Sequence, residues 1–235
     1  MRQVSTKRRR AARLAPAARR AGLLACAVRV FARRGLAAAR HAEIATEAGV
    51  SLSTVFVYFP TRPALVAAVL DEVERFFLAQ AEAVHALDGP TPAVLQTHAS
   101  AFAASVDTHP DLVRVWIEWS AAMRAEVWPR YLDFQERMVR IIATTIARGR
   151  ASGELAGEDD PEDDARLLVA AAHMIAQMKL THRDPALVDR FLRTMVRATV
   201  GTDARPAGAA ASPVRTAQAG SGARPPAARR RRRAR

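Results

Sequence analysis

Disulfides, membrane spans and secretion signals are all missing from this sequence. Its one cysteine, Cys26, cannot form an intramolecular disulfide, which fits a reducing compartment. No apolar run approaches the roughly 20 residues that a membrane-spanning helix needs. The basic first ten residues are not followed by the apolar core of a signal peptide. We therefore expect a cytoplasmic protein without a membrane partner.

The motifs of common enzyme classes are missing as well. The chain has no glycine-rich phosphate loop, no nucleophile elbow and no Cys–His pair. The acidic run at residues 158–164 suggests a metal site, but acids in the first turn of a helix that begins near Pro161 explain it better. Six histidines are scattered without the paired spacing of metal ligands: His41, His85, His98, His109, His173 and His182. We expect neither an enzyme nor a bound cofactor or metal.

Acidic residues are absent from both ends of the chain. Residues 1–42 contain 12 Lys or Arg and no acid, and residues 204–235 contain 9 Arg and no acid. The stretch between them has 15 basic and 23 acidic residues, so the net charge of +13 comes from the two ends. A basic N-terminus predicts contact with phosphate, whereas the acidic middle is a poor nucleic-acid surface.

Alternating β-branched runs are absent too, and only 11 glycines occur. Alanine-rich segments with apolar residues at steps of three and four take their place, which predicts an all-α fold. Proline and glycine breakers divide these segments into about nine helices. We expect one helix at residues 17–34, two within 41–59, and the others at 61–87, 93–108, from 110, 129–150, 161–182 and 185–200.

These features divide the chain into four parts. Residues 1–16 are a basic flexible arm, 17–60 a DNA-binding headpiece, 61–203 a larger helical body and 204–235 a tail. The tail, rich in Arg, Pro and Ala, has almost no large apolar side chains to bury, so we predict disorder there. Its five consecutive arginines at the end either add nonspecific attraction to DNA or are simply solvated.

The headpiece contains the spacing of a helix-turn-helix. A small residue, Ala45, is followed four positions later by Gly49 and six positions after that by the apolar Val55. Gly49 supplies the left-handed turn residue between two helices, and Val55 seats the second helix. Residues 51–59 then become a recognition helix, short enough to lie in a DNA major groove.

This arrangement resembles the TetR family of bacterial transcription regulators. The resemblance rests on the run from Thr54 to Arg62, followed by Leu65. Further motifs at residues 31–35, 41–42, 58–62, 115–120 and 126–129 resemble the quorum-sensing master regulators of the LuxR/HapR type. The resemblance covers most of residues 5–200. It implies a homodimer that reads a pseudo-palindromic operator through its two headpieces. It also implies that the body, residues 61–203, binds ligand and dimerises.

The resemblance and the motif together predict the residues that contact double-stranded DNA. Val57 stands where the branch usually has Asn, so an apolar contact, for instance to a thymine methyl, replaces a bidentate contact to adenine. We expect Ser51 to cap the recognition helix and the arm to enter a minor groove. The predicted DNA-binding residues are Arg8, Arg9, Arg10, Arg13, Ser51, Ser53, Thr54, Val57, Tyr58, Thr61 and Arg62.

Two further sites are predicted in the body. Phe77, Trp116 and Gln135 lie where the branch lines a pocket for a small apolar or amphipathic effector, and Trp119 and Trp128 are either further walls or core. The last two helices are the expected dimer interface. Its candidate contacts, which equally suit the monomer core, are Met174, Met178, Phe191 and Met195.

Two alternative functions remain at this point. One is a sequence-nonspecific architectural DNA binder, which the basic ends favour and the acidic middle disfavours. The other is a local repressor of an efflux or catabolic gene, which shares the fold and the mechanism of a global quorum-sensing regulator.

Overall fold

The computed structural model of the chain describes residues 15–123, 126–157 and 159–200, all of which belong to one compact unit. This part of the chain contains nine α-helices and no strand, which confirms the predicted all-α fold. The predicted tail, and Arg8, Arg9, Arg10 and Arg13 of the predicted arm, lie outside the described residues. The helices are α1 (Pro16–Ala38), α2 (His41–Ala48), α3 (Leu52–Tyr58), α4 (Arg62–His85), α5 (Thr91–Thr108), α6 (Pro110–Ala121), α7 (Trp128–Ala151), α8 (Pro161–Leu180) and α9 (Pro185–Val200).

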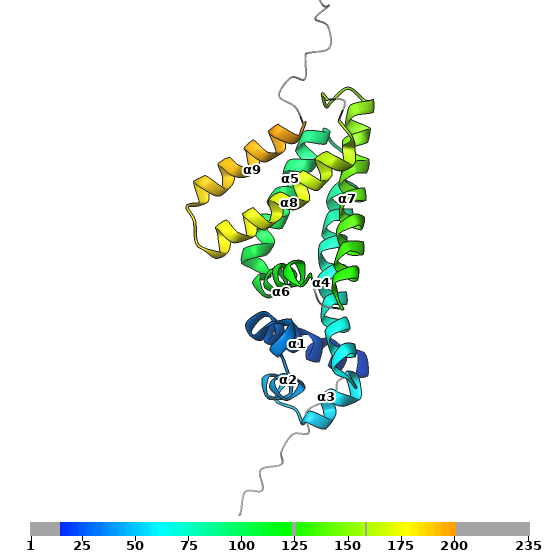
Figure 1. Cartoon of the computed structure of the whole chain (residues 1–235), viewed down its shortest axis with the longest axis vertical. Coiled ribbons are helices and arrows are strands. Elements are labelled where there is room, and N and C mark those ends of the chain that lie inside the picture. Colours follow the sequence, from blue (N-terminus) through cyan, green and yellow to red (C-terminus); the bar gives the residue numbers. More distant parts are fainter. Residues whose placement is uncertain (1–14, 124–125, 158, 201–235) are drawn as a thin grey trace, which may run out of the picture. The chain divides into compact units, whose positions relative to one another are not determined.

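Helices α1, α2 and α3 pack together as a small three-helix headpiece (Figure 1). Two glycines set its turns. Gly35 breaks the regular helix of α1 with φ 84° and ψ 164°, and Gly49 ends α2 in the left-handed conformation with φ 64°. Both positions disfavour any residue with a Cβ atom. The centre of the headpiece is formed by side chains exposed by 1% or less: Phe31, Ile44, Val55 and Phe59.

Helix α4 connects the headpiece to the body. It starts next to α1 and continues alongside α7 (Figure 1), and its buried residues follow a step of four that includes Leu65, Val69, Val73, Phe77 and Ala81. This spacing places one apolar stripe along the whole helix. The same helix therefore contributes to the headpiece core at one end and to the body core at the other.

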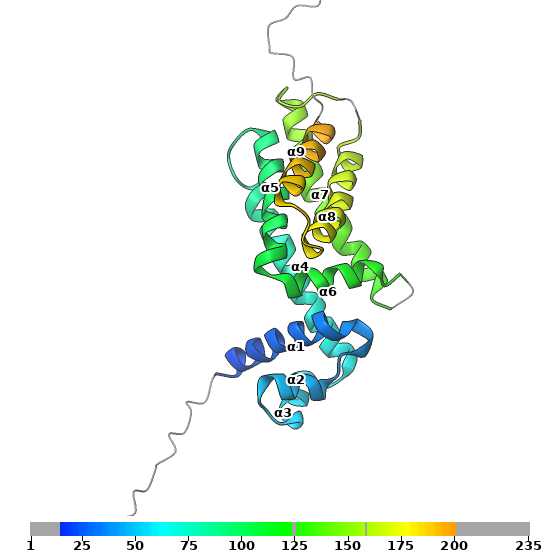
Figure 2. The same ribbon diagram turned by 90° about the vertical axis from the view of Figure 1, so that its left-hand side faces the viewer.

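Helices α5 to α9 complete the body. Helix α8 packs against α5, α7 and α9, and Figure 2 shows α9 beside α5 and α8 on one side of this bundle. The core includes Trp119, Ile142, Ile146 and Ile175, all exposed by 2% or less. No single described helix is long and apolar enough to cross a bilayer; only α3 and α4, bent by 67° at their junction, meet the length and composition test as a pair.

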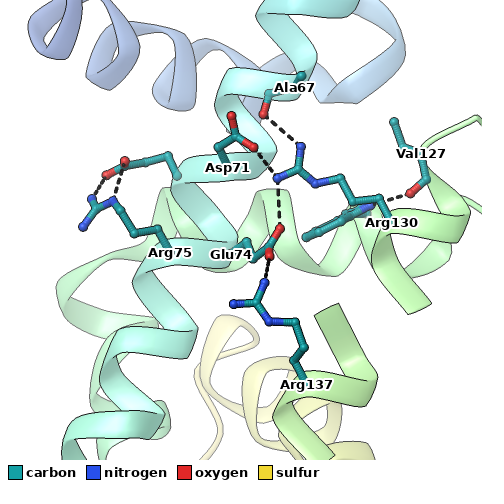
Figure 3. A network of polar contacts seen from close by, with 9 residues as sticks. Ala67, Asp71, Glu74, Arg75, Val127, Arg130 and Arg137 are labelled. Carbon is teal, nitrogen blue, oxygen red and sulfur yellow. Dashed lines mark hydrogen bonds and ion pairs between the residues drawn. The ribbon is translucent and has the colours of Figure 1, made fainter. Parts of the chain in front are cut away.

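A network of ion pairs fastens α4 to α7 (Figure 3). The guanidinium of Arg130 on α7 donates to Asp71 at 2.5 Å, to Glu74 at 2.9 Å and to the carbonyl oxygen of Ala67 at 3.3 Å. Arg137, two turns further along α7, donates to the other carboxylate oxygen of Glu74. Because α4 carries the headpiece at its start, this network helps to set the direction of that helix relative to the body.

Candidate nucleic-acid interface and ligand cavity

Helix α3 presents one face to the headpiece core and the opposite face to solvent. Val55 and Phe59, four residues apart, are exposed by 0% and 1%. At about 100° per residue, Ser53 and Val57 lie on the other side of the helix. Both are exposed, and the side chain of Val57 reaches 77%. These two positions are therefore the ones that α3 offers most directly to a DNA groove.

Hydroxyl groups cap the helices on either side of this face. The Ser51 Oγ accepts a hydrogen bond from the Thr54 backbone N–H at 3.2 Å, which confirms the expected cap of the recognition helix. The same oxygen lies 2.9 Å from the Ser53 Oγ and 2.8 Å from the Thr54 Oγ1. Thr61 caps α4 in the same way, because its Oγ1 accepts from the Ala64 N–H at 3.2 Å. These caps hold the predicted DNA-contacting hydroxyls in place.

The aromatic neighbours of α3 include one contact that the sequence did not predict. His41 stacks on Phe56 with ring centroids 4.5 Å apart and an interplanar angle of 15°, and its Nε2 lies 2.9 Å from the carbonyl oxygen of Phe59. Leu52 and Phe56 are exposed by 44% and 42%, although both are large and apolar. Tyr58 is half-buried against the headpiece core. The spacing of four between Leu52 and Phe56 was the available signal for a second apolar row.

Arg62 at the start of α4 binds the backbone after α1. Its guanidinium donates to the carbonyl oxygens of Leu36, Ala37 and Ala39 at 2.5, 2.9 and 2.6 Å. These carbonyls follow the break at Gly35, where the regular helix no longer supplies their partners. In this structure Arg62 therefore stabilises the connection between α1 and α2. The expected ionic contact of Arg62 with phosphate stays a prediction.

Basic residues on α1 are partly neutralised by α2. Arg29 and Arg33 bind the two carboxylate oxygens of Glu47 at 2.8 and 2.7 Å, and Arg34 lies 2.6 Å from Glu43. The hydrogen bond from Arg29, followed by that from Arg33, lowers the pKa of Glu47. These arginines therefore join α1 to α2, and their charge is less available to phosphate.

The body encloses a cavity of about 50 Å³ among α4, α5, α6, α7, α8 and α9. The three residues predicted to bind ligand, Phe77, Trp116 and Gln135, all line it, although they come from three different helices. Ligand pockets usually enclose about 300–1,000 Å³, so the side chains nearly fill this one in the present state. The remaining walls are mostly apolar and include Leu95, Phe102, Phe134, Met138, Leu168, Val169, Ile175 and Met195.

A pair of histidines supplies a polar group at the cavity wall. His98, which lines the cavity, has its Nδ1 3.2 Å from the Nε2 of His85, whose Nδ1 lies 2.8 Å from the Oγ1 of Thr145. Burial, followed by the nearby His85, lowers the pKa of His98 to about 3. Burial, followed by the charge of Arg148, lowers the pKa of His85 to about 4. Both rings are neutral at pH 7, and no spacing signal in the sequence predicted the pair.

Trp116 lines the cavity and also contacts α8. Its ring lies 6.0 Å from Phe77, 5.4 Å from Phe102 and 4.3 Å from His173 on α8, measured between centroids. The Nε2 of His173 lies 2.9 Å from the Oγ of Ser120, and burial lowers the pKa of this histidine. His173 is therefore a half-buried histidine whose ring is hydrogen-bonded within the body.

The other two tryptophans do not line this cavity. Trp119 is fully buried and donates from its Nε1 to the carbonyl oxygen of Val127 at 3.0 Å. Trp128 is half-buried and stacks on Tyr131 with centroids 5.1 Å apart. Trp119 and Trp128 were expected either to line the pocket or to belong to the core, and the structure supports core packing for both residues.

The same helix that carries Trp116 also contacts the headpiece. Glu118, two residues further along α6, accepts a hydrogen bond from the Leu36 N–H at 2.7 Å. A Cβ atom at Gly35 would lie only 2.6 Å from the same carboxylate oxygen. Because Gly35 has no side chain, Glu118 of the body can approach closely and bind the end of α1. Glu118 is two residues away from Trp116, which lines the cavity.

Comparison with known proteins identifies the family. Residues 23–69 match the model of bacterial regulatory proteins of the tetR family. The HTH-type transcriptional regulator LuxR of Vibrio harveyi is 34% identical over 171 residues, which cover 73% of this chain and 83% of LuxR. The chain belongs to the TetR family. It is a DNA-binding transcriptional regulator and not an enzyme.

Solved structures of transcriptional regulators share the fold. A regulator from Agrobacterium tumefaciens superposes with a TM-score of 0.71 at 16% identity, covering 80% of this chain and all of that protein. A TetR-like regulator from a Rhodococcus species gives 0.66 at 19% identity, with 80% and 100% coverage. FadR of Bacillus subtilis, solved in complex with stearoyl-CoA, gives 0.64 at 17% identity, with 77% and 97% coverage.

The four candidate dimer contacts of this TetR-family chain fall into two groups. Met174 on α8 is 46% exposed, and Leu167, two turns earlier on the same helix, is 62% exposed. Met178 and Phe191 are half-buried against the monomer core. Met195 is also half-buried, and it lines the cavity. In the single chain, α8 thus offers the more exposed apolar surface.

Proposed function

We propose that this TetR-family regulator acts in the cytoplasm as a homodimer that binds a pseudo-palindromic operator through its two copies of α3. One headpiece reads only a half-site, so high affinity needs a second copy in the symmetric position. The observation that carries the proposal is the outward face of α3, where Ser53 and Val57 lie opposite the buried Val55 and Phe59. The exposed Leu167 and Met174 on α8 are the favoured contacts between the two copies, supported at the margin by Met178, Phe191 and Met195.

We further propose that a small apolar or amphipathic effector enters the cavity beside Trp116. The cavity must widen to accept it, since about 50 Å³ holds only a few water molecules. Movement of Trp116 would shift α6, and with it the hydrogen bond from Leu36 to Glu118 at the headpiece. His98 offers a neutral polar partner to the effector at the cavity wall. Such coupling typically changes DNA affinity about 5- to 150-fold.

The operator is found by selecting duplexes from a randomised library with the full chain. We expect a two-fold symmetric site bound by two chains, and a duplex with one half-site should bind far more weakly. A monomer that binds random and selected duplexes equally would contradict the proposal and favour the architectural alternative. The affinities must be compared at one salt concentration, because phosphate contacts make them depend on salt.

The effector proposal is tested with stearoyl-CoA as the probe, since FadR of Bacillus subtilis was solved with this molecule in the same fold. We expect the probe to alter operator affinity for the wild type and not for Trp116→Ala. Trp128→Ala is the matched control, because Trp128 lies outside the cavity wall. If Trp116→Ala and the wild type respond equally, the cavity is not the effector site.

The range of target genes is a separate question. The similarity to LuxR of Vibrio harveyi favours a global regulator of the quorum-sensing type. Genome-wide mapping of binding sites decides between this role and that of a local repressor. Many dispersed sites would support the global role, and one site beside an adjacent efflux or catabolic gene would support the local one.

A further inference from the structure

Large apolar side chains are concentrated on the solvent side of the recognition helix. Among the described residues, eight large apolar side chains are exposed, and three of them lie on the seven-residue α3. They are Leu52 at 44%, Phe56 at 42% and Val57 at 77% exposure. Exposing apolar surface in water costs free energy, so such a cluster marks an interaction surface.

Because the cluster lies on the recognition helix, its partner should be a chemical group in a groove of DNA. Phosphate oxygens and the polar edges of the bases gain nothing from a valine side chain. The major groove contains one apolar group, the C5-methyl of thymine. Val57 lies one turn after Ser53 on the face opposite the headpiece core, so it reaches the floor of a groove when α3 enters it.

Phe56 is held in place before DNA binds. Its ring stacks on His41 at a centroid distance of 4.5 Å, and the Nε2 of His41 is fixed by the carbonyl oxygen of Phe59 at 2.9 Å. A side chain that is already ordered loses less conformational entropy on binding. The Phe56 ring is therefore an ordered apolar group next to Val57, and it remains 42% exposed.

We propose that α3 recognises C5-methyl groups of pyrimidines in its operator, with Val57 as the central contact and Phe56 as a flanking one. This inference rests on the proposed function, because it describes what the recognition helix reads. Thymine is the expected source of the methyl group, and 5-methylcytosine carries the same group at the same place. The half-site should contain at least one thymine whose methyl group sets affinity.

The test removes single methyl groups from DNA. In the selected operator, each thymine is replaced in turn by deoxyuridine, which keeps every hydrogen-bonding group of the base. We expect at least one position to weaken wild-type binding about fourfold, the effect of burying one methyl group. The Val57→Ala variant should bind the unmodified operator more weakly and should lose most of this dependence on the methyl group.

Two controls separate recognition from general damage. Leu87→Ala removes a side chain that is 50% exposed outside the headpiece, and it should retain the wild-type response to deoxyuridine. A cytosine placed at the sensitive position is then compared with 5-methylcytosine. Tighter binding to the methylated base would extend recognition to both sources, and no gain would support thymine as the sole source.

The outcomes distinguish this inference from the function on which it rests. If the protein prefers the selected operator but tolerates deoxyuridine at every position, the methyl-reading inference is wrong and sequence-specific binding stands. If it shows no preference among duplexes, the proposed function itself fails. If Val57→Ala keeps the full fourfold dependence, the methyl group is read by another residue and Val57 is not the central contact.

Discussion

Replacing Gly35 by alanine is expected to destabilise the protein strongly at the contact between headpiece and body. Gly35 adopts φ 84° and ψ 164°, a region used almost only by glycine. Placing another residue there costs about 1–3 kcal/mol. The new Cβ atom would also lie 2.6 Å from the Glu118 Oε1, which accepts the Leu36 N–H at 2.7 Å.

The second contribution comes from this hydrogen bond. Moving the carboxylate away breaks a bond between a charged acceptor and a partly buried N–H, which is worth about 1.5–3 kcal/mol. Gly35→Ala should therefore lower the free energy of unfolding by about 2.5–6 kcal/mol in total. Urea denaturation followed by circular dichroism measures this quantity, and operator affinity should fall as well because α1 loses its attachment to α6.

Gly22→Ala is the matched control in the same helix. No atom lies within 4 Å of a Cβ built at Gly22, and the position is helical. Alanine should stabilise the helix there by about 0.5–1 kcal/mol, so the same substitution has opposite signs at the two sites. In a Glu118→Ala background, Gly35→Ala should cost only the backbone strain. Equal stability of Gly35→Ala and the wild type would show that Gly35 is neither strained nor closely packed against Glu118.

Three further substitutions or conditions give expected outcomes. Ser51→Ala removes the cap of α3 and should lower the free energy of unfolding by about 1 kcal/mol in urea. Arg130→Lys cannot join α4 to α7 through several bonds at once, so it should lower the free energy of unfolding by about 1 kcal/mol at low salt. Arg166→Lys, at an exposed position of α8, should leave the free energy of unfolding nearly unchanged. The lowered pKa values of His85 and His98, about 4 and 3, keep both neutral in the folded state, while the unfolded chain binds protons below about pH 6.5. The contribution of this pair to the free energy of unfolding should therefore be fully present above about pH 6.5 and decrease toward pH 4, by at most about 2.7 kcal/mol per pH unit. His98→Gln should reduce the slope of the free energy of unfolding against pH. An unchanged slope would contradict the assignment of both rings as neutral in the folded state.

Local sequence signals predicted most of the fold. Proline and glycine breakers located the nine helices of the described residues to within a few positions, because a helix cannot easily pass them. The caps at Ser51, Thr61 and Asp160 were equally predictable, since each side chain bonds an N–H only two or three residues away. Such features depend on neighbours in the sequence.

Features that depend on distant partners were missed. The turn of Arg62 toward the backbone depends on carbonyl groups more than 20 residues earlier. The pairing of His85 with His98 depends on how α4 packs against α5. The cavity residues Phe77, Trp116 and Gln135 were named by family resemblance, because no periodicity relates three residues on different helices.

The central claim is that two copies of α3 read the sequence of a symmetric DNA site. The most direct measurement compares the affinity of the purified full chain for its selected palindromic duplex and for a shuffled duplex of the same composition, at one salt concentration. We expect binding of two chains and a preference of about 1,000-fold or more for the palindrome. Equal affinity for both duplexes, or binding as a single chain, would contradict it.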